Sequence, residues 1–142
     1  MELAEKNALF ANNLAWLLAT CPRAELQDAH RSVTLAQRAV LLEAQTGEYW
    51  NTLGVAYYRA GQWTPAVDAL EKSMRYQGGN SWDWFFLAMA HWRLGEQDKA
   101  RQCYEQALAW MEKHKPQDPE LIRFRAEASE LLKSEGSTLG KP

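Results

Sequence analysis

Apolar residues recur every three or four positions in several stretches of the chain, which is the spacing of one face of an α-helix. In residues 32–43 the apolar positions are Val33, Ala36, Ala39 and Val40. In residues 64–75 they are Ala66, Val67, Leu70 and Met74. Both stretches are therefore predicted to be amphipathic helices that bury one stripe.

Glycines mark where these helices end. Gly61 and Gly95 each follow a helical stretch, and glycine most easily adopts the left-handed backbone that terminates a helix. Gly78 follows the stretch at 64–75 in the same way. Pro65 stands in the first turn of that stretch, where its missing N–H removes no hydrogen bond. The pattern predicts helices joined by short turns.

Two other segments differ from this plan. Residues 20–28 include Pro22, which cannot lie inside a continuous helix, so we expect a loop or short turn there. Asp118, Pro119 and Glu120 form a strong helix start, with the aspartate as the cap and the glutamate near the positive end of the helix dipole. We predict an amphipathic capping helix over 119–133 and a disordered tail over 134–142.

The chain also repeats itself with a period of 34 residues. Pairs that match at this offset are Trp50 and Trp84, Leu53 and Leu87, Tyr58 and Trp92, Arg59 and Arg93, Gly61 and Gly95, and Ala66 and Ala100. A period of this length is typical of a solenoid built from helix pairs. With a degenerate copy in front, the chain is predicted to have seven helices, which are three antiparallel pairs and a cap.

The residues of these copies resemble the tetratricopeptide repeat (TPR). One copy reads Trp50-x-x-Leu53-Gly54-x-x-Tyr57 followed by Ala66 and Leu70, and the next reads Trp84-x-x-Leu87-Ala88-x-x-His91 followed by Ala100 and Tyr104. The second copy departs from the pattern at His91, and both copies lack the closing proline. More loosely, segments 14–22 and 82–92 resemble repeat modules of large bacterial multidomain proteins.

The resemblance implies an all-α fold: an α-α superhelix, or right-handed solenoid, of three TPR-like helical hairpins plus a C-terminal capping helix. The repeats would occupy about residues 8–46, 47–80 and 81–114. Together with the capping helix over 119–133, they would form a single domain over residues 1–133.

Composition excludes several classes of protein. The chain has 142 residues, 16 Lys and Arg, 18 Asp and Glu, and a net charge of −2, so we expect no nucleic-acid partner held by phosphate neutralisation. No apolar run approaches the ~20 residues that span a bilayer, so we expect no membrane partner. The two cysteines, Cys21 and Cys103, form no disulfide framework and suit a reducing, cytoplasmic location.

The resemblance implies that the first helix of each pair lines a concave groove that binds a protein or peptide. The predicted partner-binding residues are Asn12, Trp16, Asn51, Tyr58, Arg59, Phe86, Met89, Trp92 and Arg93. The aromatic side chains would anchor the ligand, the arginines would pair a carboxylate or carbonyls, and the asparagines would bond the peptide backbone.

Aromatic residues at helical spacing are also typical of a core, and the sequence leaves this alternative open. Trp50 and Trp84 are expected in the core between layers. Trp82, Phe85 and Phe86 are expected in the core or under the cap rather than in the groove. For Trp16, Tyr58 and Trp92 the sequence favours neither place, and Arg59 and Arg93 also suit solvated helix C-termini.

No pattern for catalysis, a cofactor or a metal stands out, and His91 is expected to be an interior histidine with a polar partner. In TPR domains that grip acidic chaperone tails, a clamp of Lys, Asn and Arg holds the carboxylate. The corresponding positions here are Asn12, Trp16, Thr52, Trp82 and Phe86, so a chaperone-tail clamp is not expected.

The favoured function is a non-enzymatic interaction module, that is, a scaffold or adaptor. The alternative is a structural module that self-associates as a weak homo-oligomer or docks on a neighbouring domain of a larger polypeptide. An RNA-binding repeat is a third possibility, which a more basic groove would favour.

Overall fold

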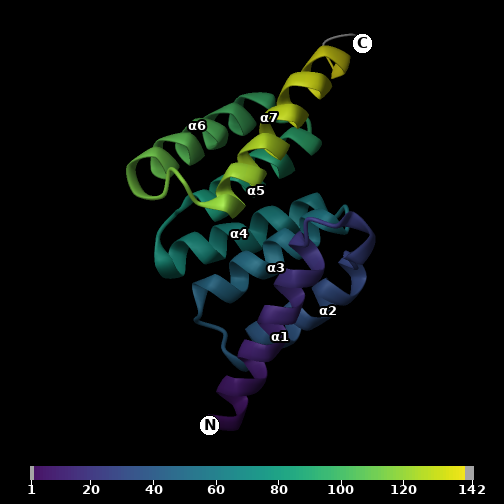
Figure 1. Cartoon of the computed structure of the whole chain (residues 1–142), viewed down its shortest axis with the longest axis vertical. Helices are drawn as coiled ribbons and strands as arrows, with labels where there is room; N and C mark the ends of the chain where they lie inside the picture. The colour runs from purple at the N-terminus through teal and green to yellow at the C-terminus, as the bar shows by residue number, and fades with distance from the viewer. Residues whose placement is uncertain (1, 140–142) are drawn as a thin grey trace. The chain divides into compact units, whose positions relative to one another are not determined.

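The structure is a computed structural model that describes residues 2–139, with the backbone alone at residues 2, 4 and 134–139. Over this range the chain forms seven α-helices, one short 3-10 helix and no β-strand. The helices are α1 (Glu2–Thr20), α2 (Ala29–Leu42), α3 (Gly47–Arg59), α4 (Trp63–Gln77), α5 (Ser81–Arg93), α6 (Gln97–His114) and α7 (Pro119–Leu139) (Figure 1). The prediction of an all-α helical repeat fold is confirmed.

The 34-residue period of the sequence reappears in the backbone. Helices α3 and α5 begin and end 34 residues apart, and so do the first residues of α4 and α6. Gly61 and Gly95 both have left-handed backbone, with φ of 77° and 83°. After each glycine the next backbone N–H closes the turn, from Gln62 to Tyr57 O and from Glu96 to His91 O, both at 2.9 Å. The two hairpins therefore share one local geometry.

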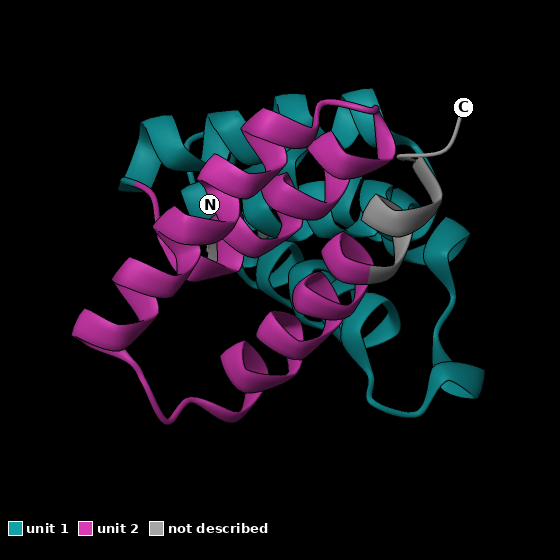
Figure 2. Cartoon of the chain, turned by 90° about the horizontal axis from the view of Figure 1, so that it is seen from above, with its two compact units in different colours: residues 1–78 teal, residues 79–142 magenta. Residues whose placement is uncertain are grey.

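The chain divides into two compact units, residues 1–78 and 79–142 (Figure 2). Unit 1 contains α1 to α4, in which α1 packs on α2 and α3, and α3 packs on α2 and α4. Unit 2 contains α5 to α7, in which α5 packs on both α6 and α7.

Small residues let the helices of unit 1 approach one another closely. Most members of its core that come from α1 and α2 are alanines: Ala8, Ala11, Ala15, Ala36 and Ala39. At Gly54 a Cβ atom would stand only 2.5 Å from Leu70 Cγ, so α3 and α4 cross where no side chain fits. The buried hydroxyl of Ser32 donates to Ala15 O at 2.7 Å and ties α2 to α1.

Unit 2 has a larger and more aromatic core. Its fully buried large side chains are Phe85, Phe86, Leu87, Met89, Trp92, Met111, Leu121 and Phe124. Ser81 Oγ donates to Ala107 O at 2.6 Å, which joins α5 to α6. Aromatic side chains on α5 are thus enclosed by the two helices that follow it.

The loop after α1 and the start of α7 adopt the predicted local structure. Residues 21–28 are a loop with a 3-10 helix at Ala24–Leu26, as Pro22 requires, and Asp28 then caps α2. Asp118 accepts from the backbone N–H of Leu121 at 3.1 Å and begins α7. Helix α7 runs to Leu139, past the predicted boundary at residue 133. Residues 140–142 of the predicted disordered tail lie outside the described residues.

The two repeat tryptophans, Trp50 and Trp84, are only partly buried, whereas the sequence indicated core positions. Trp50 packs against the edge of the unit 1 core, and its indole N–H donates to Ala44 O at 2.7 Å. The ammonium of Lys72 lies 4.4 Å above its ring. The position near the start of the helix places the ring beside the preceding loop, which leaves one side in contact with solvent.

Candidate functional site

Helix α1 carries two of the predicted partner-binding residues. The Asn12 side chain is buried, and its Oδ1 atom has no hydrogen-bond partner among the described residues. Trp16, one turn further along, is partly exposed. An unpaired buried carbonyl oxygen is costly, by about 1–3 kcal/mol, so Asn12 keeps an acceptor that the fold itself does not use.

The Tyr58–Arg59 pair at the end of α3 holds unit 1 together. Arg59 Nε donates to Ala19 O at 2.8 Å, which satisfies a carbonyl at the C-terminus of α1. The guanidinium carbon of Arg59 lies 5.9 Å from the centre of the Tyr58 ring. Tyr58 in turn packs on Trp63 of α4, with ring centres 5.2 Å apart. These contacts join three helices, whereas the sequence suggested ligand contacts.

Asn51 and Thr52 of α3 are also buried. The Thr52 hydroxyl donates back to Glu48 O at 3.2 Å, within its own helix. Of the residues on this helix that were predicted to face a groove, only Arg59 retains a partly exposed surface.

In unit 2 the predicted anchors Phe86, Met89 and Trp92 expose 0%, 0% and 1% of their surface. Phe86 packs edge-to-face on Phe124 of α7, with ring centres 4.9 Å apart. These three side chains therefore present no surface to a partner in this structure, which differs from the predicted groove. The physical reason at Phe86 is that α7 covers this face of α5.

Of the neighbouring residues Trp92 and Arg93, the first is buried and the second is exposed. The Arg101 guanidinium of α6 lies 5.2 Å from the centre of the buried Trp92 ring. Arg93, the next residue, is exposed. Arg93 therefore keeps a surface at the end of α5 that a partner can reach.

Trp82 and Phe85 of α5 follow the alternative of packing in the core or under the cap. The Trp82 indole donates to Glu120 Oε1 of α7 at 3.1 Å, and its ring meets Trp110 of α6 edge-on at 6.0 Å. Phe85 packs on Tyr104 with ring centres 5.9 Å apart. The aromatic third repeat thus stabilises unit 2.

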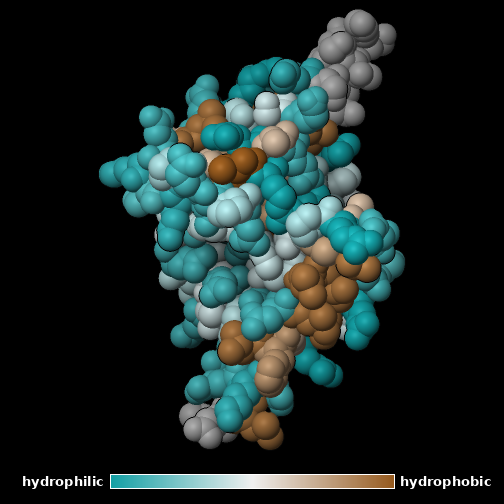
Figure 3. Space-filling model, viewed as in Figure 1, coloured by the Kyte–Doolittle hydropathy of each residue, from teal (hydrophilic) through white to brown (hydrophobic). Residues whose placement is uncertain are grey.

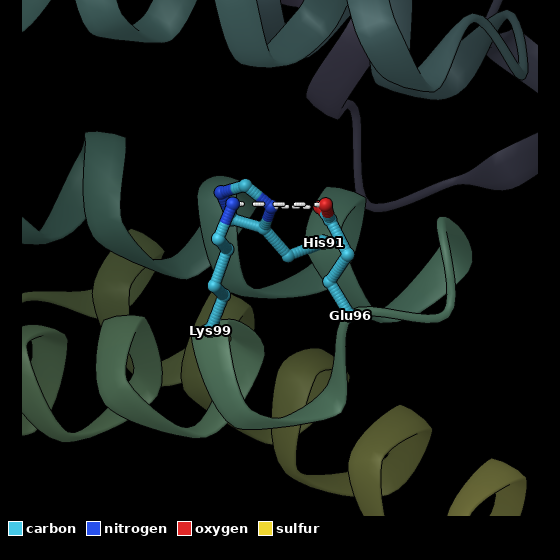
Figure 4. Close-up of polar contacts among 3 residues, drawn as sticks. All are labelled: His91, Glu96 and Lys99. Atoms are coloured by element: carbon cyan, nitrogen blue, oxygen red, sulfur yellow. Dashed lines mark hydrogen bonds and ion pairs between the residues drawn. The ribbon is translucent and has the colours of Figure 1, made fainter.

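His91, Glu96 and Lys99 form a polar cluster at the turn between α5 and α6 (Figure 4). His91 Nδ1 lies 2.7 Å from Glu96 Oε1, and Lys99 Nζ lies 3.7 Å from Glu96 Oε2. The hydrogen bond from His91, assisted by the charge of Lys99, holds the pKa of the Glu96 carboxyl below its ordinary value of 4.5. His91 is the polar-paired interior histidine that the sequence indicated.

The described residues contain no group of three or more His, Cys, Asp or Glu side chains that could hold a metal ion. Cys21 is partly exposed and Cys103 is buried, and no disulfide joins them. An open hollow between α6 and α7 has charged walls formed by Arg101, Glu105 and Lys133, and it contains none of the predicted partner-binding residues.

Comparison with known families identifies the repeats. A tetratricopeptide repeat model matches residues 82–114, and a second tetratricopeptide repeat model matches residues 52–76. The chain therefore carries two tetratricopeptide repeats. The two matched TPR segments lie on α5–α6 and on α3–α4, which are the hairpins related by the 34-residue period.

A solved TPR structure is similar over almost the whole chain. The TPR domain of Sgt2 from Aspergillus fumigatus matches with a TM-score of 0.64, covering 96% of this chain and 83% of that chain. The sequence identity is 16%, so this likeness shows the fold alone. No curated protein matches the chain in sequence. None of the described helices is long and apolar enough to cross a membrane.

One exposed surface of the chain could not be foreseen from the repeat pattern. Large apolar side chains lie exposed on α1, namely Leu3, Leu9, Phe10, Leu14 and Leu17. A signal for it exists in the sequence, because no charged residue occurs between Lys6 and Arg23. A helix with one face in water usually carries charges on that face.

Proposed function

We propose that the chain is a non-enzymatic interaction module that binds a peptide or a partner domain on the faces of its first helices. The observation that carries this proposal is the pair of tetratricopeptide repeats at 52–76 and 82–114, because stacked helix pairs offer extended binding surfaces. We further propose that it acts in the cytoplasm, since Cys21 and Cys103 are not joined by a disulfide.

The contact that we favour lies on α1 in unit 1. Trp16 offers a large, rigid and partly exposed ring, which is the kind of side chain that dominates interface energies. Asn12 offers a buried oxygen that no other described residue bonds. A backbone N–H of the ligand that reaches Asn12 Oδ1, after a neighbouring side chain moves, would remove the cost of the unpaired acceptor.

The remaining predicted residues have different roles in this proposal. Tyr58, Phe86, Met89 and Trp92 are buried, so we expect them to affect binding only through stability. Arg93 in unit 2 is exposed and suits a separate contact with a carboxylate or a carbonyl.

The experiment selects peptides from a random displayed library on the wild-type protein and measures the affinity of a selected peptide by calorimetry. We expect Trp16→Ala to weaken binding by about tenfold or more, the size of a hot spot, with little change in the melting temperature. Gln106→Ala, at an exposed site on α6, is the matched control and should bind as the wild type does.

Two results would count against the proposal. One is a selected peptide that binds the Trp16→Ala, Asn12→Ala and Arg93→Ala variants as tightly as the wild type. The other is a library selection that yields no peptide whose binding depends on any of these three residues. A peptide with an acidic chaperone-type tail is expected to bind no better than a scrambled peptide, because Trp16 and Thr52 replace clamp residues.

A further inference from the structure

Helix α1 carries its small residues inside and its large apolar residues outside. The face that packs on α2 and α3 contains the buried residues Ala8, Ala11, Ala15 and Ala19. The opposite face carries Leu3, Phe10, Leu14 and Leu17, which expose 70%, 71%, 36% and 56% of their surface. An amphipathic helix with a solvated outer face has the reverse arrangement.

We call Leu3, Phe10, Leu14 and Leu17 the outer α1 stripe. They are separated by seven, four and three residues, so they lie on one side of a helix with 3.6 residues per turn. Figure 3 shows hydrophobic surface gathered along α1. At roughly 200 Å² for a fully exposed large side chain, the stripe exposes on the order of 400 Å², which is within the range typical of a functional patch.

Phe10, Leu14 and Leu17 of the stripe lie in a segment without charge, whereas Leu3 lies before it, next to Glu2, Glu5 and Lys6. Between Lys6 and Arg23 the sequence contains no charged residue. The exposed face of α4, by contrast, carries Asp68, Glu71, Lys72 and Arg75. Along the roughly two helical turns from Phe10 to Leu17, a partner for the stripe must therefore be apolar and uncharged.

A membrane surface fits this requirement poorly. Helices that lie in a membrane interface carry Lys and Arg beside the apolar face. Within residues 2–20 the only basic residue is Lys6, against the acidic residues Glu2 and Glu5. The charges beside the stripe thus do not favour anionic lipid.

We infer that the outer α1 stripe binds the same stripe of a second copy of this chain, in an antiparallel two-fold dimer. Phe10 lies seven residues from both Leu3 and Leu17. A two-fold axis at Phe10 therefore brings Phe10 against Phe10 and Leu3 against Leu17 of the second copy, about 10 Å along the helix on either side. The same axis brings Leu14 against Lys6, which lies four residues before Phe10 and whose aliphatic stem can pack on a leucine. A two-fold interface requires a self-complementary surface.

The polar residues beside the stripe fit the same arrangement. Asn7 and Asn13 each lie three residues from Phe10, so the axis also brings Asn7 near Asn13 of the second copy. Both are exposed, and two amide side chains can donate to and accept from each other. They would form the polar rim that surrounds the apolar centre of an interface.

The area is sufficient for a weak dimer. A standard interface buries about 800 Å² on each partner, and the stripe supplies about half of this as apolar centre. We expect dissociation in the micromolar range. The inference does not rest on the proposed partner site, because Asn12 is buried on the opposite side of α1.

The first test measures molar mass by sedimentation equilibrium at protein concentrations from about 1 to about 200 μM. We expect the wild-type mass to rise from 16.3 kDa toward twice that value. Phe10→Asp should remain monomeric with an unchanged helical spectrum, because the Phe10 side chain is mostly exposed. Tyr76→Asp, which changes an exposed aromatic residue on α4, is the matched control and should dimerise like the wild type.

The second test measures the geometry with spin labels at Leu3→Cys, in a background carrying Cys21→Ser and Cys103→Ala. In the antiparallel dimer the two labelled sites lie about 20 Å apart along the helix axis. A separation near 10 Å, as between neighbouring parallel helices, would overturn the arrangement.

Three further results would overturn the inference. They are a wild-type protein that stays monomeric at the highest concentration, a dimer that Phe10→Asp leaves intact, and a monomer that cosediments with phosphatidylcholine–phosphatidylserine vesicles through Phe10. The last of these would assign the stripe to a lipid surface.

Discussion

Replacing Trp92 by alanine tests whether this residue is core or binding surface. Trp92 is the largest fully buried side chain, at 1% exposure, and it lies beneath the Arg101 guanidinium. Truncating a buried tryptophan to alanine costs about 3–5 kcal/mol, which is a large share of the ~5–15 kcal/mol that stabilises a domain. We therefore expect Trp92→Ala to lower the free energy of unfolding by about 3 kcal/mol or more.

Two companion variants make the test specific. Trp84 lies 34 residues after Trp50 and is partly exposed. We therefore expect Trp84→Ala to lower the free energy of unfolding by a smaller amount, about 1–2 kcal/mol. Trp92→Phe keeps a ring in the core and removes the buried Nε1–H, which has no hydrogen-bond partner in the described part of the chain. Because an unpaired buried donor costs about 1–3 kcal/mol, we expect Trp92→Phe to lie within about 1 kcal/mol of the wild type.

The assay is urea unfolding followed by far-ultraviolet circular dichroism, since the seven tryptophans make fluorescence ambiguous. The free energy of unfolding must fall with the same slope against urea concentration in each variant, because only then do differences between the unfolding midpoints report differences in stability. A loss below about 1 kcal/mol for Trp92→Ala, together with a larger loss for Trp84→Ala, would refute the assignment of Trp92 to the core.

Two other predictions concern the helix crossing in unit 1 and the polar turn in unit 2. Gly54→Ala is expected to destabilise by about 1–3 kcal/mol in urea unfolding, because the new Cβ would stand 2.5 Å from Leu70 Cγ; a neutral result would contradict the close crossing. Because the pKa of Glu96 is lowered by folding, its stabilising contribution is complete above the ordinary value of 4.5 and is lost as the pH falls through the lowered pKa. We expect the stability difference between the wild type and Glu96→Gln to be larger at about pH 6 than at about pH 3, and equal differences would show that the His91 contact does not perturb Glu96.

Local patterns in the sequence determined the helices and their ends. Gly61 and Gly95 take up left-handed backbone at equivalent turns, Pro22 lies in the loop after α1, and Asp118 caps α7. Each of these depends on the conformational preferences of a residue and its near neighbours, so each can be predicted without knowing the rest of the fold. The 34-residue period then indicated which helices pair.

Only the tertiary structure decided which helix faces remain open. A stripe of apolar residues looks the same in sequence whether a ligand or another helix covers it, since both require the same spacing. The outcome depended on contacts between distant residues, such as Trp82 with Glu120 and Arg59 with the carbonyl of Ala19, which are 38 and 40 residues apart. These contacts enclosed the aromatic face of α5 and left Phe10 on α1 exposed, because burial depends on which surfaces meet when the helices pack.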